Sequence, residues 1–188
     1  MNNNSILKLS VSGLLIAIGV IIPMFSPLKI LLEPAASFTL ASHVAIFIAM
    51  FISPSVAASV TVGVAVGFLL SGFPPVVAAR AASHIIFSLL GAFYLGKTPV
   101  TSLSPLGLRA YSFLIALVHA ICELVAVSLF YFGGYLAESQ YQEGFFVSIF
   151  VLVGIGTAIH SMVDFEIAHA IVVSLQKQKG FNSLINKG

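Results

Sequence analysis

Three short polar patches interrupt the apolar stretches in the second half of the chain. Each patch pairs a charged residue with a histidine four positions away. The pairs are Arg80 with His84, His119 with Glu123, and His160 with Asp164. Residues at i and i+4 share one face of a helix, so three helices would each present one polar face. A charge near the middle of a bilayer costs about 2.5–3.5 kcal/mol on insertion scales and marks a functional site by default. We expect the three faces to meet, either around a pocket or in a network that locks the helices together.

These residue types allow several kinds of chemistry. Histidine, glutamate and aspartate at successive depths can relay protons or ions, as in a small channel or a metal permease. They can also hold a metal, but no tight ligand spacing such as H-E-x-x-H occurs, so we expect no metal site and no cofactor. No nucleophile–base pattern stands out, and we expect neither catalytic residues nor enzyme activity. The remaining possibility is a pocket that binds a small molecule.

The composition identifies the elements that must position these groups. Residues of the hydrophobic set make up 59 % of the 188 residues and charged residues 7 %, with a mean hydropathy of +1.11. A soluble domain carries about 25 % charged residues. This excludes a soluble enzyme, a disordered chain and a nucleic-acid-binding protein. We expect an all-α integral membrane protein that forms one domain, residues 1–188, because no loop is long enough to fold separately.

Low-charge runs predict six transmembrane helices, since one crossing needs about 20 apolar residues. The predicted spans are residues 9–25, 36–52, 54–70, 75–95, 110–132 and 157–176. The last apolar tract, residues 144–175, exceeds one span. We therefore place a break at Gly154 and Gly156, with the sixth helix starting near Thr157.

Lysine and arginine residues set the predicted orientation. With the N-terminus in the cytoplasm, one basic residue, Lys29, lies outside. The basic residues then inside are Lys8, Lys97, Arg109, Lys177, Lys179 and Lys187. Both termini are thus predicted to be cytoplasmic, in a multi-pass protein of the bacterial plasma membrane.

At a rise of 1.5 Å per residue, the three polar pairs and a lone histidine, His43, fall in the outer half of the bilayer. The depth of the last pair depends on its helix start. A start near Phe146 would move Asp164 into the inner half and out of the cluster. We expect Glu166 and His169 to be structural or interfacial. The cluster is thus predicted to line a pocket open to the outer face.

One motif is misleading. The segment GAFYLGKT, residues 91–98, matches the phosphate-binding pattern G-x-x-x-x-G-K-[ST]. That loop requires a preceding strand and a following helix, whereas this segment ends an apolar helix and Pro99 follows at once. We expect a helix terminus with an interfacial lysine and no nucleotide site.

Small residues spaced by four occur on two predicted helices. Gly13 and Ala17 lie on the first, and Gly63 and Gly67 on the third. Such pairs let helices approach closely in lipid. For the third helix we expect internal packing, and for the first either internal packing or a face for a partner. The loop at residues 26–37 is either a plain connector or a cover over the pocket.

With these features the chain resembles the substrate-binding S components of energy-coupling factor (ECF) vitamin transporters. The segments SHVAIFIAMFISPSVAASV, GFPPVVAARAASHIIFSLLGA and IHSMVDFEIAHAI are similar to the niacin-specific branch. The resemblance covers most of the chain. It implies an outward-facing pocket built by helices four to six and capped by the loop between helices one and two. It also implies a transmembrane coupling subunit and two ATPase subunits as partners, and no motor in the chain itself.

The resemblance also implies residue roles. The small-residue motif that contacts the coupling subunit maps onto Gly13 and Ala17, with glycine replacing the usual first alanine. If the ligand is nicotinate, Arg80 is the expected carboxylate partner. His84, His160 or Asp164 would contact the ring nitrogen. Glu123 would orient Arg80 or the remaining candidate, His119. Another small water-soluble vitamin is the alternative substrate.

Overall fold

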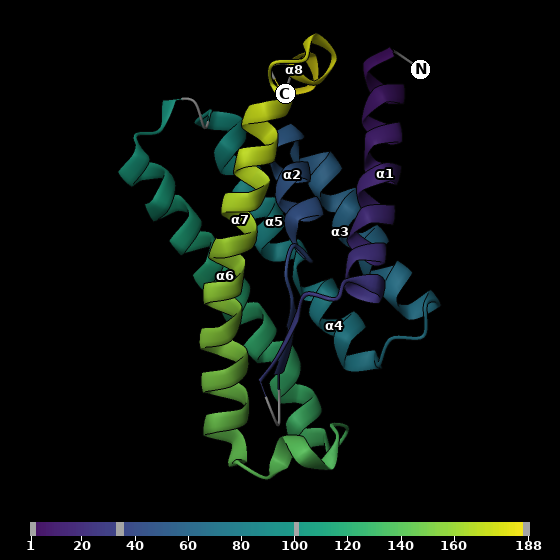
Figure 1. Cartoon of the computed structure of the whole chain (residues 1–188), viewed down its shortest axis with the longest axis vertical. Helices are drawn as coiled ribbons and strands as arrows, with labels where there is room; N and C mark the ends of the chain where they lie inside the picture. Colours follow the sequence, from purple (N-terminus) through teal and green to yellow (C-terminus); the bar gives the residue numbers. More distant parts are fainter. Residues whose placement is uncertain (1–2, 33–35, 100–101, 186–188) are drawn as a thin grey trace.

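A computed structural model describes residues 3–32, 36–99 and 102–185. It is a helical bundle with one two-stranded hairpin (Figure 1). The helices are α1 (Asn3–Phe25), α2 (Val44–Ile52), α3 (Pro54–Leu70), α4 (Pro75–Ser83), α5 (Ile85–Lys97), α6 (Pro105–Gly133), α7 (Gly156–Leu175) and α8 (Lys179–Ile185), with the 3-10 helix η2 (Glu138–Tyr141) and the π-helix η3 (Phe146–Ile155). The strands are β1 (Lys29–Leu32) and β2 (Ala36–Thr39), which pair antiparallel.

Glycine allows the first and third helices to pack closely. A Cβ atom added at Gly63 would collide with Ile16 of α1, and one at Gly67 would collide with Val20. The small residues of α3 therefore serve internal packing, as predicted. On α1, by contrast, Gly13 and Ala17 are exposed, and nothing lies within 4 Å of a Cβ built on Gly13.

The prediction of a second helix over residues 36–52 is wrong in its first half. Ala36–Thr39 forms β2, and α2 begins only at Val44. Ala41 has a φ of 67°, a left-handed conformation that cannot continue a helix. The remaining helix has nine residues, all of them buried. Part of the loop predicted at residues 26–37 lies outside the described residues; the rest forms the hairpin.

The predicted fourth helix, residues 75–95, is present as two segments. α4 ends at Ser83, α5 begins at Ile85, and His84 lies between them. The phosphate-loop-like segment lies within α5 up to Lys97, where Thr98 caps the helix, so the expected helix terminus is observed. The predicted fifth helix corresponds to α6, which is longer than expected at 29 residues.

The predicted break at Gly154 and Gly156 is also wrong, because η3 continues directly into α7 from Phe146 to Leu175. The α-helical part begins at Gly156, close to the start predicted near Thr157. Both glycines are sites of close packing. A Cβ at Gly154 would press on Leu124 of α6, and one at Gly156 would collide with Phe38 of β2. The helix is longer than one span because its lower part, like that of α6, extends past the ends of α3 and α4 (Figure 1).

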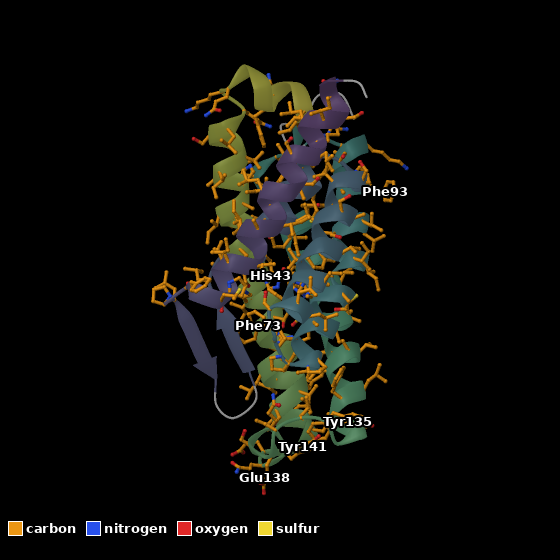
Figure 2. All side chains as sticks on the ribbon, turned by 90° about the vertical axis from the view of Figure 1, so that its right-hand side faces the viewer. His43, Phe73, Phe93, Tyr135, Glu138 and Tyr141 are labelled. Atoms are coloured by element: carbon orange, nitrogen blue, oxygen red, sulfur yellow. The ribbon has the colours of Figure 1, made fainter. Side chains whose placement is uncertain are left out.

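The chain termini and η2 lie at opposite ends of the long axis of the bundle. Both termini and α8 lie at one end in Figure 1. Glu138 and Tyr141 of η2 lie at the opposite end in Figure 2, and His43 lies between the two ends. Among the described residues, four helical stretches are long and apolar enough to cross a membrane. They are Asn4–Phe25, Pro75–Lys97, Pro105–Gly133 and Phe146–Leu175.

Candidate functional site

Glu123 of α6 is the centre of one polar cluster. Its Oε2 accepts hydrogen bonds from Arg80 Nη2 at 2.8 Å and from Thr157 Oγ1 at 2.6 Å. Its Oε1 accepts one from His84 Nε2 at 2.9 Å and lies 3.5 Å from His119 Nε2. The side chain of Glu123 is 2 % exposed. A buried carboxylate needs such partners, because an unpaired charge in a low-dielectric interior is very costly.

Asp164 of α7 is the centre of a second polar cluster. Its Oδ1 accepts a hydrogen bond from the backbone N–H of Ala41 at 2.8 Å, and its Oδ2 accepts one from that of His43 at 2.9 Å. The Nδ1 atom of His43 and the Nε2 atom of His160 each lie 3.2 Å from Oδ2. Asp164 therefore fixes the backbone of the segment that leads into α2.

His43 joins the two clusters. The centroid of its ring lies 4.9 Å from that of His84, 4.6 Å from that of His119 and 5.1 Å from that of His160, always nearly edge-on. Four histidines from α2, α4–α5, α6 and α7 thus gather around one point. Asp164 belongs to this group although its helix starts at Phe146. We had expected that a helix start near Phe146 would place Asp164 outside the cluster, and this expectation is wrong. The expectation assumed that the helix begins level with its neighbours, whereas η3 extends beyond them.

A pocket of about 380 Å³ lies beside this group. Its polar lining includes Arg80, His84, Glu123, His43 and His160. Its apolar walls include Phe38 of β2, Phe68 of α3 and Phe73 of the following turn. Pro23, near the end of α1 farther from the N-terminus, also contributes. The pocket therefore lies beside the end of α1 that is farther from the N-terminus, near the middle of the long axis of the bundle (Figure 2).

The predicted site residues divide into two sets. Five of the seven line the pocket, as given above. The other two, His119 and Asp164, are completely buried behind it at 0 % exposure, where they contact the lining residues. Two further residues considered from the sequence lie elsewhere: Glu166 is exposed, and His169 packs against Phe51 and Phe165.

The chain is also similar to a known protein. The niacin transporter NiaX of Lactococcus lactis subsp. cremoris (strain MG1363) is 34 % identical to it over 161 residues, which is 86 % of this chain and 71 % of that protein. The chain belongs to the NiaX family. No family model matches the chain, and no solved structure matches it. With its long apolar helices, this member of the NiaX family is a multi-pass helical membrane protein.

Sequence reasoning missed three hydroxyl groups in this NiaX-family site. Ser42 Oγ lies 3.2 Å from His43 Nδ1 and 3.1 Å from His160 Nε2. Thr157 donates to Glu123, as described above, and Ser161 Oγ lies 3.0 Å from His119 Nδ1. Thr157 and Ser161 are four residues apart on one helix, so the spacing rule used for charged pairs would have identified them had hydroxyl groups been included.

Proposed function

We propose that this chain is the substrate-binding S component of an ECF-type importer and that its substrate is niacin. Membership of the NiaX family supports a transporter of this vitamin. One observation in the structure carries the assignment of the pocket: Arg80 lies on the wall of a cavity whose lining also includes three phenylalanine rings and three imidazole rings. Such a cavity suits a flat ring that bears a carboxylate.

The size of the pocket and the presence of an arginine in its lining fit nicotinate. An apolar cavity of about 150 Å³ can hold benzene, so 380 Å³ has room for one ring with one substituent. The Arg80 side chain is 18 % exposed, and its buried Nε atom has no hydrogen-bond partner among the described residues. We expect the guanidinium to bind the carboxylate. We expect Ser42 or His160 to donate a hydrogen bond to the pyridine nitrogen.

Substitution of Arg80 tests the carboxylate contact. We expect Arg80→Ala to weaken nicotinate binding by about 1.5–3 kcal/mol, roughly 10- to 150-fold, because a charge-assisted hydrogen bond is lost. The measurement is isothermal titration of purified protein with nicotinate and with the uncharged nicotinamide. The matched control is Arg109→Ala, which removes an exposed arginine of α6. Unchanged nicotinate affinity in Arg80→Ala, with the helical content intact, would remove the proposed contact.

The identity of the substrate has a separate test. Protein purified without added ligand should carry nicotinate, which mass spectrometry of the extracted small molecules would identify. Recovery of another water-soluble vitamin in stoichiometric amount would contradict the niacin assignment and leave the S-component assignment intact.

We infer that six segments cross the membrane, with both termini in the cytoplasm: α1, the hairpin with α2, α3, α4–α5, α6, and η3–α7. The basic residues near the chain ends and the common position of the two termini support this orientation (Figure 1). The pocket would then face outward. We infer that the coupling subunit, with its two ATPases, docks on α1 at Gly13 and Ala17, which are exposed.

Gly13→Trp tests the docking face. The bulky side chain should abolish niacin uptake in cells that contain the coupling subunit and ATPases, while leaving niacin binding unchanged. The native chain contains no tryptophan, so the emission of the new residue also reports whether the partner approaches. Leu129→Trp, on the exposed side of α6, is the control. Normal uptake by Gly13→Trp would place the docking face elsewhere.

The channel and permease alternative has less support. A relay requires polar groups at successive depths across the bilayer. Four histidines instead gather in one cluster with Glu123 and Asp164. Glu166 and His169 lie apart from this cluster. We infer a binding protein without catalytic residues.

A further inference from the structure

We propose that His43, His84, His119 and Glu123 form a binding site for a divalent transition-metal ion, and that the ion is Zn²⁺. The four side chains come from the start of α2, the α4–α5 junction and α6. Each offers one ligand atom, and these four atoms all lie within 4.8 Å of one another. Imidazole nitrogen and carboxylate oxygen are typical zinc ligands, and four of them complete a tetrahedral shell.

The spacing around Glu123 fits such a shell. Zinc–nitrogen bonds of about 2.0–2.1 Å place neighbouring tetrahedral ligands about 3.3 Å apart. From Glu123 Oε1, the Nε2 atom of His84 lies 2.9 Å away and that of His119 lies 3.5 Å away. The His119 Nε2 atom is buried and has no hydrogen-bond partner among the described residues. A metal ion between these three atoms would satisfy it.

The outer atoms of three of the ligands are held by other groups, whereas His84 Nδ1 has no hydrogen-bond partner among the described residues. A histidine that binds a metal usually bonds through its second nitrogen to a carboxylate or another polar group, which fixes the ring. His43 Nδ1 lies 3.2 Å from Asp164 Oδ2, and His119 Nδ1 lies 3.0 Å from Ser161 Oγ. Both bonds leave Nε2 available for the ion. The second oxygen of Glu123 is likewise bonded, as described above.

The ring packing supports a shared ligand. The centroids of the three imidazoles lie 4.5–4.9 Å apart, and none of the four ligand residues is more than 9 % exposed. Placing several imidazoles together in an apolar bundle is costly unless their nitrogens have partners. One cation can serve all of them.

A metal ion would also change the charge of the pocket. With neutral histidines, the described site holds one cation, Arg80, and two anions, Glu123 and Asp164. This net negative charge opposes an anionic ligand. A divalent ion reverses the sign and draws a carboxylate into the pocket. This consequence, unlike the metal site itself, rests on the proposed function.

The proposal replaces the expectation of no metal site that we drew from the sequence. A motif search detects ligands that are close along the chain. Here one pair, His119 with Glu123, has helical spacing, and the other two ligands are brought in by separate helices.

The experiment begins with full-length protein purified in detergent without a polyhistidine tag and stripped of metal with a chelator. We expect titration with Zn²⁺ to give one tightly bound ion per chain, and Co²⁺ in its place to give the intense visible bands of a tetrahedral site. His119→Gln, which lies behind the pocket, should lose both signals. His169→Gln, outside the cluster, should retain them. Circular dichroism checks that each variant is folded.

The outcomes separate the two proposals. Wild-type protein that binds no Zn²⁺ and gives no Co²⁺ spectrum overturns the metal site, even if it binds nicotinate. Equal metal binding by His119→Gln and wild type overturns the ligand assignment. Metal binding without nicotinate binding supports the site and contradicts the proposed function. At least tenfold tighter nicotinate binding by the zinc-loaded protein supports the metal site and its effect on charge.

Discussion

Two buried carboxylates of this protein share one sequence pattern and differ in what they hold. Glu123 and Asp164 each follow a histidine by four residues on a long helix. Glu123 bonds to side chains of other helices and lines the pocket. Asp164 bonds to two backbone N–H groups and is buried behind the pocket. The pattern therefore identifies a polar helix face, and the partner across the interface determines whether that face positions a ligand contact or fixes the backbone.

The largest expected effect is on stability, from Asp164→Ala. This change leaves the half-buried N–H group of Ala41 and the buried N–H group of His43 without an acceptor, and the free energy of unfolding should fall by about 3–5 kcal/mol. Thermal unfolding in detergent, followed by circular dichroism, measures it. Glu166→Ala, which removes an exposed acid of the same helix, should have little effect. A variant with normal stability and weak nicotinate binding would make Asp164 a ligand contact, contrary to our assignment.

The next effect is on affinity, from Glu123→Gln. An amide offers one acceptor oxygen in place of two, so Arg80, His84 and Thr157 can no longer all keep their bonds. We expect nicotinate affinity to fall about tenfold, which is about 1.4 kcal/mol, with a smaller loss of stability than in Asp164→Ala. Titration and thermal unfolding of the same preparation test both parts. Wild-type affinity would show that Glu123, like Asp164, serves the fold alone.

The smallest effect is expected from Thr157→Val, which keeps the shape of the side chain and removes its 2.6 Å hydrogen bond to Glu123. The loss should be about 1 kcal/mol, seen as a several-fold weaker nicotinate affinity. The matched control is Thr61→Val, because the Thr61 hydroxyl bonds to Ala57 and Ser88 away from the pocket. Equal affinity losses in the two variants would mean that the effect is general loosening of the bundle.

The polar faces were predictable because their rule is local. Helical spacing places Arg80 and His84 on one side of a helix. In an apolar bundle, such a polar side is stable only where it faces another polar side or a cavity. The ion pair of Arg80 with Glu123 is a contact of this kind between two polar faces. Whether these residues bind a substrate stays a prediction.

The start of α2 was not predictable from hydropathy. Residues 36–43 carry no charged side chain, and half of them are Ser, Thr or His. Strand pairing of Ala36–Thr39, the conformation of Ala41 and the bonds to Asp164 keep the helix from starting before Val44. Glycine was ambiguous in the same way. Gly154 and Gly156 were predicted to break the helix, yet each instead allows a neighbouring side chain to approach closely. In both cases the deciding contact comes from a part of the chain far away in sequence.

The large sequence separation between Asp164 and its backbone partners has a consequence for biosynthesis. It accepts bonds from residues that lie 121 and 123 positions earlier in the chain. A ribosome will have delivered the early helices to the membrane well before this carboxylate emerges. Until then the amides ahead of α2 lack their acceptor, and His43 lacks the neighbour that fixes its ring. A chain truncated before α7 would therefore contain most of the pocket's residues and still be unable to assemble it.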